Sequence, residues 1–267
     1  MFNLFKIELR KAYSNKAFWI LLGLYTLLTV IVFFSIQGVI DLAFDKAGAN
    51  SPFPIPKESI YTFPKVYQNL AYIAGFYKIF LAILIIIFVT NEYSYRTIRQ
   101  NVVNGMSREG VLIGKLLLIF VISLFSMILI FLCSIILGFI NTDGVTSSMF
   151  FEKMFFIPTY FLEVFFYLCF AMMIAHIVKR SGLAIGIFFL YSYIVEYILY
   201  YKLPDSINDY LPLRAIGGLV KIPNTQLMQI FGINFQEYVG LPELISSFVW
   251  AIIFVSISYL LIKKRDL

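Results

Sequence analysis

Six long apolar stretches alternate with more polar segments along the chain. Their approximate ranges are 17–37, 72–90, 111–140, 154–178, 183–201 and 243–262. An α-helix needs about 20 residues to cross the roughly 30 Å hydrocarbon core of a bilayer, and each stretch is close to that length or longer. The pattern therefore predicts an all-α polytopic membrane protein with six transmembrane helices, in one transmembrane domain that covers residues 1–267.

The segments between the stretches predict the loops. Those expected on the outer side are 38–71, 141–153 and 202–242. Prolines between positions 52 and 64 exclude a regular helix in that part of the first loop. In the last loop, Leu211–Val220 and Thr225–Val239 are too apolar to be fully solvated. They are expected to be either short helices that cover the bundle or parts of a small folded outer cap.

Composition and charge support this class of protein and predict its orientation. Hydrophobic residues make up 61% of the chain and charged residues 13%, which is too apolar for a soluble domain of 267 residues. Thirteen of the 21 basic residues lie at the two ends and in the second and fourth connections. Because cytoplasmic segments are enriched in Lys and Arg, both termini are expected in the cytoplasm, and the net charge of +6 needs no nucleic-acid partner.

The residues before the first stretch have helical periodicity. Phe2, Phe5, Leu9 and Ala12/Tyr13 fall on one face of a helix over 2–15, and Lys6, Arg10 and Ser14 lie on another. This pattern predicts a short basic amphipathic helix that lies in the inner membrane interface and turns into the membrane near Asn15. The alternative is a frayed basic tail that only sets the orientation.

The second cytoplasmic connection, residues 91–110, carries the signals of a short helix between spans two and three. Asn91 can cap its beginning, and Glu92 lies in its first turn, where the helix dipole favours an acid. Asn104-Gly105 is typical of a helix end, and Ser107 can cap the next helix. Such a helix could transmit movement from a partner on the inner surface. The alternative is a solvated linker whose arginines only set the orientation.

The same connection resembles a known family. The runs Glu92-Tyr93-Ser94-Tyr95-x-Thr97-Ile98-Arg99, Gly105-Met106-Ser107-Arg108 and Gly114-Lys115 are similar to the stretch that follows span two in the type-2 ABC transporter permeases. In that family the stretch couples the membrane subunit to an ATPase. The resemblance implies an ATPase-coupling loop with these residues: Glu92, Tyr95, Arg96, Thr97, Arg99, Gly105, Ser107 and Arg108. Arg96 stands where many relatives have glycine.

The resemblance also implies a function. The chain is expected to be the permease subunit of an ABC exporter in the bacterial cytoplasmic membrane, paired with a second copy or with a similar permease. ATP and Mg²⁺ are expected on a separate cytoplasmic ATPase, with no cofactor and no catalytic or metal site on this chain. Gly110–Leu116 is not a phosphate-binding loop, because it has three residues between its glycines and Leu116 where Ser or Thr is needed.

Two acids lie within the predicted spans. Glu163 is placed about 12 Å, and Glu196 about 8 Å, from the outer ends of consecutive helices at 1.5 Å per residue. Buried ionisable groups usually face a cavity or a partner, so one hypothesis is that both line an outward-facing vestibule. The alternatives are that Glu163 pairs with a structural partner and that Glu196 reaches the interface among tyrosines.

Two other classes of function remain open from the sequence. One is a non-transporting membrane protein, such as an immunity or scaffold subunit. The other is an intramembrane hydrolase that uses Glu163, His176 or Glu196. It is disfavoured, because His176 is about 20 Å from Glu163 along one helix.

Overall fold

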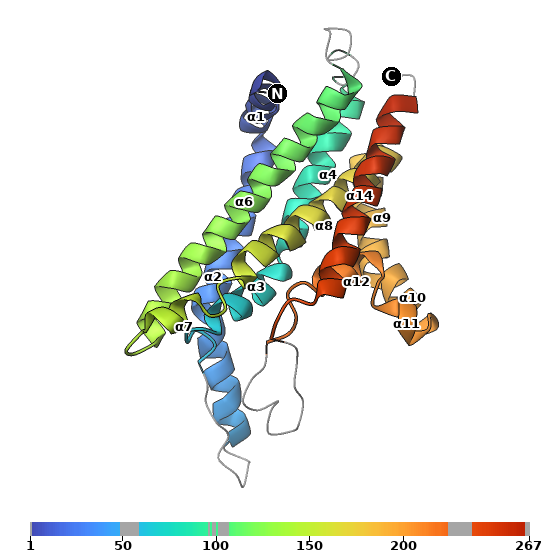
Figure 1. Cartoon of the computed structure of the whole chain (residues 1–267). Coiled ribbons are helices and arrows are strands. Elements are labelled where there is room, and N and C mark those ends of the chain that lie inside the picture. Colours follow the sequence, from blue (N-terminus) through green and yellow to red (C-terminus); the bar gives the residue numbers. More distant parts are fainter. Residues whose placement is uncertain are drawn as a thin grey trace.

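The computed structural model describes residues 2–48, 59–95, 97, 100, 107–223 and 237–264. Within these ranges the chain is helical and has no β-strand, so the predicted all-α fold is confirmed (Figure 1). Parts of two predicted segments fall outside the described residues. They are most of the helix expected in the 91–110 connection and most of Thr225–Val239.

Five helical segments of the described chain are long and apolar enough to cross a membrane. They are Lys16–Leu42, Arg108–Asn141, Ser147–Val178, Ser181–Lys202 and Leu241–Lys263. The remaining predicted span corresponds to two shorter helices, α3 (Val66–Gly75) and α4 (Lys78–Ser94), which are apolar enough when taken together. The described chain therefore provides six crossings if this bent pair forms one span.

The second span is bent, whereas the sequence predicts an unbroken helix over 72–90. The axes of α3 and α4 differ by 44°. At the break the N–H of Tyr77 donates to the carbonyl of Ala74 (2.9 Å), a tighter hydrogen bond than the α-helical one. Lys78, the first residue of α4, forms an ion pair with Glu163. A charged side chain inside an apolar segment needs such a partner, and the bend accompanies this contact.

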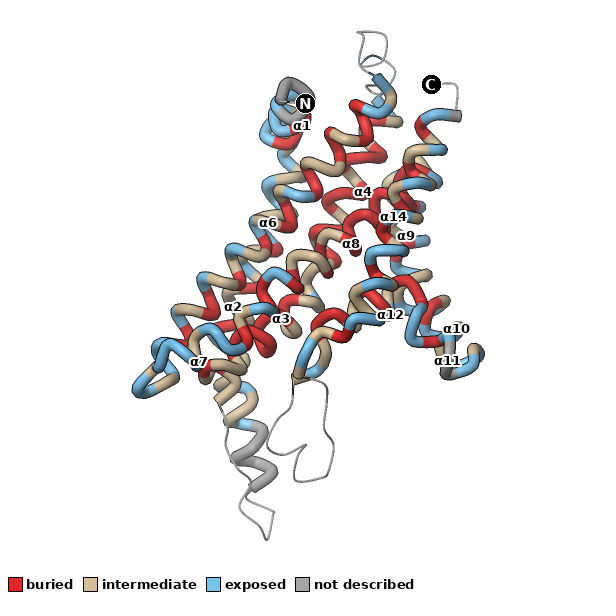
Figure 2. Tube along the Cα trace, viewed as in Figure 1, coloured by how far each residue is buried: buried red, intermediate tan, exposed pale blue. Residues whose placement is uncertain are grey.

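The helix α8 (Phe156–Val178) lies at the centre of the bundle. It contacts α3, α4, α9 (Ser181–Leu190), α12 (Pro212–Gly217) and both long helices α6 (Arg108–Asn141) and α14 (Leu241–Lys264). Its sequence is apolar all round rather than on one stripe, as expected for a helix enclosed by others. In Figure 2 the buried residues gather where α4, α6 and α8 face one another.

The outward faces of the peripheral helices are apolar but exposed. Examples on α2 (Lys16–Gly48), α6, α9 and α14 are Ile20, Leu132, Leu190 and Ile252, which are between 51% and 67% exposed. A soluble protein rarely shows contiguous apolar surface of this extent, whereas a bilayer solvates it. The fold is that of a polytopic membrane protein.

Both termini lie at one end of the bundle, together with the end of α4 and the beginning of α6 (Figure 1). We call this end the termini side. It is the side that the basic residues predict to be cytoplasmic. The predicted amino-terminal helix is present there as α1 (Phe2–Ser14). It is followed by Asn15, whose Oδ1 accepts a hydrogen bond from the N–H of Ala17 (3.0 Å).

The opposite end is built from short helices and connections. Here α2 continues to Gly48, into the segment predicted as a loop, and α3 begins at Val66. The other elements are α7 (Ser147–Phe151), a π-helical segment η1 (Tyr191–Val195) followed by α10 (Glu196–Lys202), α11 (Asp205–Asn208) and α12. The helix α12 lies within Leu211–Val220 and packs against α14 and α8. Of the two expectations for that segment, the structure therefore has a short helix that covers the bundle.

Candidate functional site

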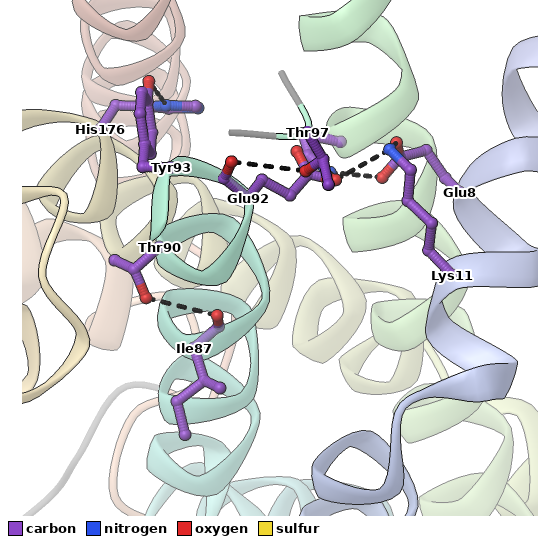
Figure 3. Close-up of polar contacts among 9 residues, drawn as sticks. Glu8, Lys11, Ile87, Thr90, Glu92, Tyr93, Thr97 and His176 are labelled. Atoms are coloured by element: carbon purple, nitrogen blue, oxygen red, sulfur yellow. Dashed lines mark hydrogen bonds and ion pairs between the residues drawn. The ribbon is translucent and has the colours of Figure 1, made fainter. Parts of the chain in front are cut away.

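Four charged side chains from three helices meet on the termini side. They are Glu8 and Lys11 of α1, Glu92 in the last turn of α4 and Lys115 in the second turn of α6, and we call them the charged quartet. Lys115 Nζ lies 2.5 Å from Glu8 and 2.6 Å from Glu92. Lys11 Nζ lies 2.7 Å from Glu8 and 2.9 Å from Glu92. Each cation therefore contacts both acids, as Figure 3 shows for Lys11.

The quartet is shielded from solvent and electrically balanced. The exposed fractions of Lys115, Glu8 and Glu92 are 1%, 3% and 6%. Lys115 Nζ also lies 4.6 Å from the centre of the Phe88 ring, a cation–π contact. Removing ions from water is costly, and only close partners of opposite charge offset that cost. Two acids and two bases satisfy this condition, so loss of any one member leaves an uncompensated charge.

Lys11 is the most accessible member of the quartet, and its ionisation follows its neighbours. Burial acts to lower its pKa, but attraction to Glu92 and Glu8 outweighs burial, so the pKa is raised above the ordinary value of 10.5. The amine of Lys11 is therefore held in its charged form at neutral pH.

A glycine on α6 allows α1 to approach. A Cβ atom placed on Gly114 would lie 2.9 Å from Cγ of Glu8, closer than real Cβ atoms come to their neighbours. Ala12, one turn further along α1, is 2% exposed. The face of α1 that packs on the bundle therefore carries Glu8 and Ala12. Leu9 and Tyr13, which the sequence pattern places on the same face as Ala12, are 37% and 76% exposed. The side chains of Phe2 and Phe5 are not among those that the structure describes.

A second contact joins α4 to the end of α8. The hydroxyl of Tyr93 and Nδ1 of His176 are 2.8 Å apart, and the two rings meet edge to face (Figure 3). Lys179, which ends α8 with a left-handed backbone (φ 62°), places Nζ 5.1 Å from the centre of the Tyr93 ring. Glu92 and Tyr93 are adjacent residues of α4. The first contacts the quartet and the second contacts α8, so α4 connects the two.

The predicted coupling residues surround this site where they are described. Glu92 belongs to the quartet, and Thr97 donates a hydrogen bond to the Glu92 carbonyl (3.3 Å). Tyr95 is 73% exposed. Ser107 accepts from the N–H of Gly110 (3.0 Å), which confirms the predicted helix cap. Arg108 donates to the carbonyl of Lys263. Three further predicted residues lie outside the described part of the chain: Arg96, Arg99 and Gly105.

Sequence reasoning missed Glu8 and Lys11 as partners of this site. The sequence predicts Lys115 as a basic residue of the cytoplasmic side and as part of the resembling run, but not as a partner of either acid. A signal existed, because an acid and a base three residues apart share one face of a helix. That face points to α6, however, only once α1 folds back on the bundle.

The two acids predicted as vestibule residues have separate structural partners. Glu163 is 3% exposed and pairs with Lys78, whose Nζ also lies 4.8 Å from the centre of the Tyr167 ring. Glu196 accepts hydrogen bonds from the backbone N–H groups of Leu213 (3.1 Å) and Arg214 (2.6 Å), at the start of α12. A pocket of about 470 Å³ on this side is lined by α12 and its neighbours, without either acid.

The fold and the site define an integral membrane protein, all-helical and polytopic, with a buried charged cluster at one end. The chain belongs to the family described as Protein of unknown function (DUF2705), whose model matches residues 51–267. No curated protein matches the chain. The match includes Glu92 and Lys115 but not α1, which supplies Glu8 and Lys11.

Proposed function

We propose that this chain is the transmembrane permease subunit of an ATP-binding-cassette transporter, an exporter driven by a separate cytoplasmic ATPase. The observation that carries the proposal is the charged quartet. It joins both helices that flank the 95–107 connection to α1, through Glu92 and Lys115. The resemblance of this connection to type-2 ABC permeases supplies the identity of the partner.

The contacts around the connection form a path for mechanical work. A partner that pushes on the segment between Tyr95 and Ser107 moves the end of α4 and the beginning of α6 together, because Glu92 and Lys115 hold them. Glu8 and Lys11 carry the displacement into α1, and the Tyr93–His176 contact carries it into α8. Packed helices move as rigid bodies, so force on the 95–107 connection reaches four helices.

The remaining parts of the proposal rest on the resemblance to type-2 ABC permeases. The exposed Tyr95 is part of the surface for the ATPase, and the resemblance assigns Arg96 and Arg99 to the same contact. ATP and Mg²⁺ bind to that partner, and two permeases, identical or similar, form the membrane part of a transporter in the bacterial cytoplasmic membrane.

Co-purification tests the proposal. The tagged chain is isolated from its native membrane in mild detergent, and the proteins that remain bound are identified and quantified. We expect an ABC-type ATPase in stoichiometric amount, with ATP hydrolysis that depends on the complex. Tyr95→Ala and Arg96→Glu are expected to reduce its retention at least tenfold. Tyr201→Ala, an equally exposed tyrosine (69%) at the opposite end, serves as the control.

Two outcomes contradict the proposal. One is a wild-type chain that retains no ATPase under conditions in which it stays folded, as expected for an immunity or scaffold protein. The other is an ATPase that Tyr95→Ala and Arg96→Glu retain in the same amount as the wild-type chain. A hydrolase gains no support from the contacts, since Glu163, His176 and Glu196 are each bound to a different partner.

A further inference from the structure

An apolar groove of about 560 Å³ lies on the termini side, between α1, α2 and α6. Its walls are Leu9 and Tyr13 of α1, Trp19 and Leu22 of α2, and Val121 and Phe125 of α6. Ala12 and Ile122 are 2% and 1% exposed and lie deeper among its lining residues. Three helices therefore line this open groove, unlike the convex faces of the peripheral helices, and its volume is within the usual range for small-molecule sites.

The groove lies where the first span enters the membrane. That span begins at Lys16, and Leu22 is six residues further, about 9 Å along the axis at 1.5 Å per residue. The indole N–H of Trp19 donates to the carbonyl of Tyr13 (2.9 Å), and the two rings meet edge to face. Exposed Trp and Tyr are typical of the boundary between hydrocarbon and headgroups. The groove thus extends from the headgroup boundary to the depth at which the first carbons of a lipid acyl chain lie.

The groove is lined by one charged residue, and its charge is positive. Arg10 is the charged residue among those that line the groove, and its side chain is exposed. No residue in the described part of the chain bonds its guanidinium. Lys16, at the start of α2, is also exposed, and Lys6 lies one helical turn before Arg10 on α1. The acid of α1, Glu8, is turned the other way, toward Lys115.

We propose that this groove binds one anionic phospholipid of the adjacent leaflet. One acyl chain lies between α1, α2 and α6, and the phosphate is held by Arg10 with Lys16 nearby. Basic pockets beside transmembrane helices recognise anionic headgroups in this way. The lipid occupies the face of α1 that carries Leu9 and Tyr13, whereas Glu8 and Lys11 point to the quartet. This inference is independent of whether the chain binds an ATPase.

Native mass spectrometry of the purified 267-residue chain tests the inference. The delipidated protein is titrated in detergent with phosphatidylglycerol and, separately, with phosphatidylcholine of the same acyl chains. We expect one phosphatidylglycerol to be retained preferentially. Arg10→Gln is expected to weaken its binding about fivefold, since one cation near a lipid headgroup contributes about a factor of five. Arg180→Gln, which removes an exposed arginine elsewhere on the termini side, is the matched control and leaves binding unchanged.

A second variant tests the apolar part of the site. Val121→Trp fills the groove and is expected to abolish retention of the lipid, with thermal unfolding used to verify the fold. If that variant does not fold, Leu9→Trp places the indole on an exposed wall position instead. Soluble glycerol phosphate is expected not to compete, because it lacks the chain that the groove takes up.

Four results of the binding experiments overturn the inference. They are equal retention of the two lipids by the wild-type chain, unchanged binding by Arg10→Gln, lipid binding that survives filling of the groove, and competition by glycerol phosphate. A lipid-free dimer in which the second copy covers Trp19, detected by protection of that residue from a water-soluble quencher, overturns it as well.

Discussion

Glu92 and Lys115 lie 2.6 Å apart and join the end of α4 to the beginning of α6, on either side of the connection that leaves the bundle. Neither side chain is solvated, with exposed fractions of 6% and 1%. The pair is completed by Glu8 and Lys11 of α1, so a local contact between two sequential spans also determines where the amino-terminal helix lies.

Removal of one acid from the quartet is expected to destabilise the protein. Glu92→Gln leaves two lysines facing Glu8 alone, and breaking a buried ion pair from one side costs about 3 kcal/mol or more. Lys115→Met in the same chain restores the charge balance between Lys11 and Glu8. The double variant is therefore expected to be more stable than the two single effects predict, as measured by thermal or denaturant unfolding in detergent.

The double-mutant cycle distinguishes a charge effect from lost packing. Independent sites give free energies of unfolding that add within about 0.5 kcal/mol. Additivity at Glu92 and Lys115 would show that the ion pair does not couple them. Lys153→Met, which removes a lysine paired with Glu237 at the opposite end, provides a control for loss of an ion pair outside the quartet.

The raised pKa of Lys11 predicts a loss of stability at alkaline pH. A lysine whose pKa is higher in the folded state contributes stability that is fully present below its unfolded pKa, here the ordinary 10.5, and disappears as the pH rises through the folded value. The free energy of unfolding is therefore expected to decline above about pH 10.5. Lys11→Met should lower stability at neutral pH and show a smaller decline, and equal slopes for the two proteins would contradict the assignment.

Close packing of α1 depends on Gly114. A larger side chain there would meet Cγ of Glu8, so Gly114→Val is expected to displace α1 from the bundle and make its backbone accessible to protease. The expected result is faster tryptic cleavage after Arg10 and Lys11, with the remaining bundle intact. Gly182→Val is the matched control, because a Cβ on Gly182 has no neighbour within 4 Å. Equal cleavage rates in the two variants would mean that α1 is not held against α6.

The sequence predicted the helical architecture because bilayer thickness fixes the length of an apolar span. It predicted the Ser107 cap for a similar reason, since a cap is a contact within one turn. The break before Lys78 was not predictable. Its stabilising partner, Glu163, is 85 residues away, and no local pattern joins the two.

The candidate site was predictable only in part. Glu92 was identified from its local run, whereas its partners in α1 depend on how that helix folds back on α6. The vestibule hypothesis treated Glu163 and Glu196 as a pair because they have similar depth. Depth alone does not say which way a side chain points, and the backbone groups that Glu196 binds belong to a helix in a later loop.

The Lys78–Glu163 pair yields the last prediction. If Glu163 serves chiefly to balance Lys78 at the bend, Glu163→Gln is expected to cost about 3 kcal/mol of stability, because it leaves a charged lysine that is largely buried. Glu163→Gln combined with Lys78→Met removes both charges and is expected to recover most of that loss. Unfolding in detergent measures stability, and transport by the complete complex measures function in the same variants. A double variant that is stable but inactive would instead assign Glu163 to the transport path, whereas a stable and active one identifies the pair as a structural support of the bend between α3 and α4.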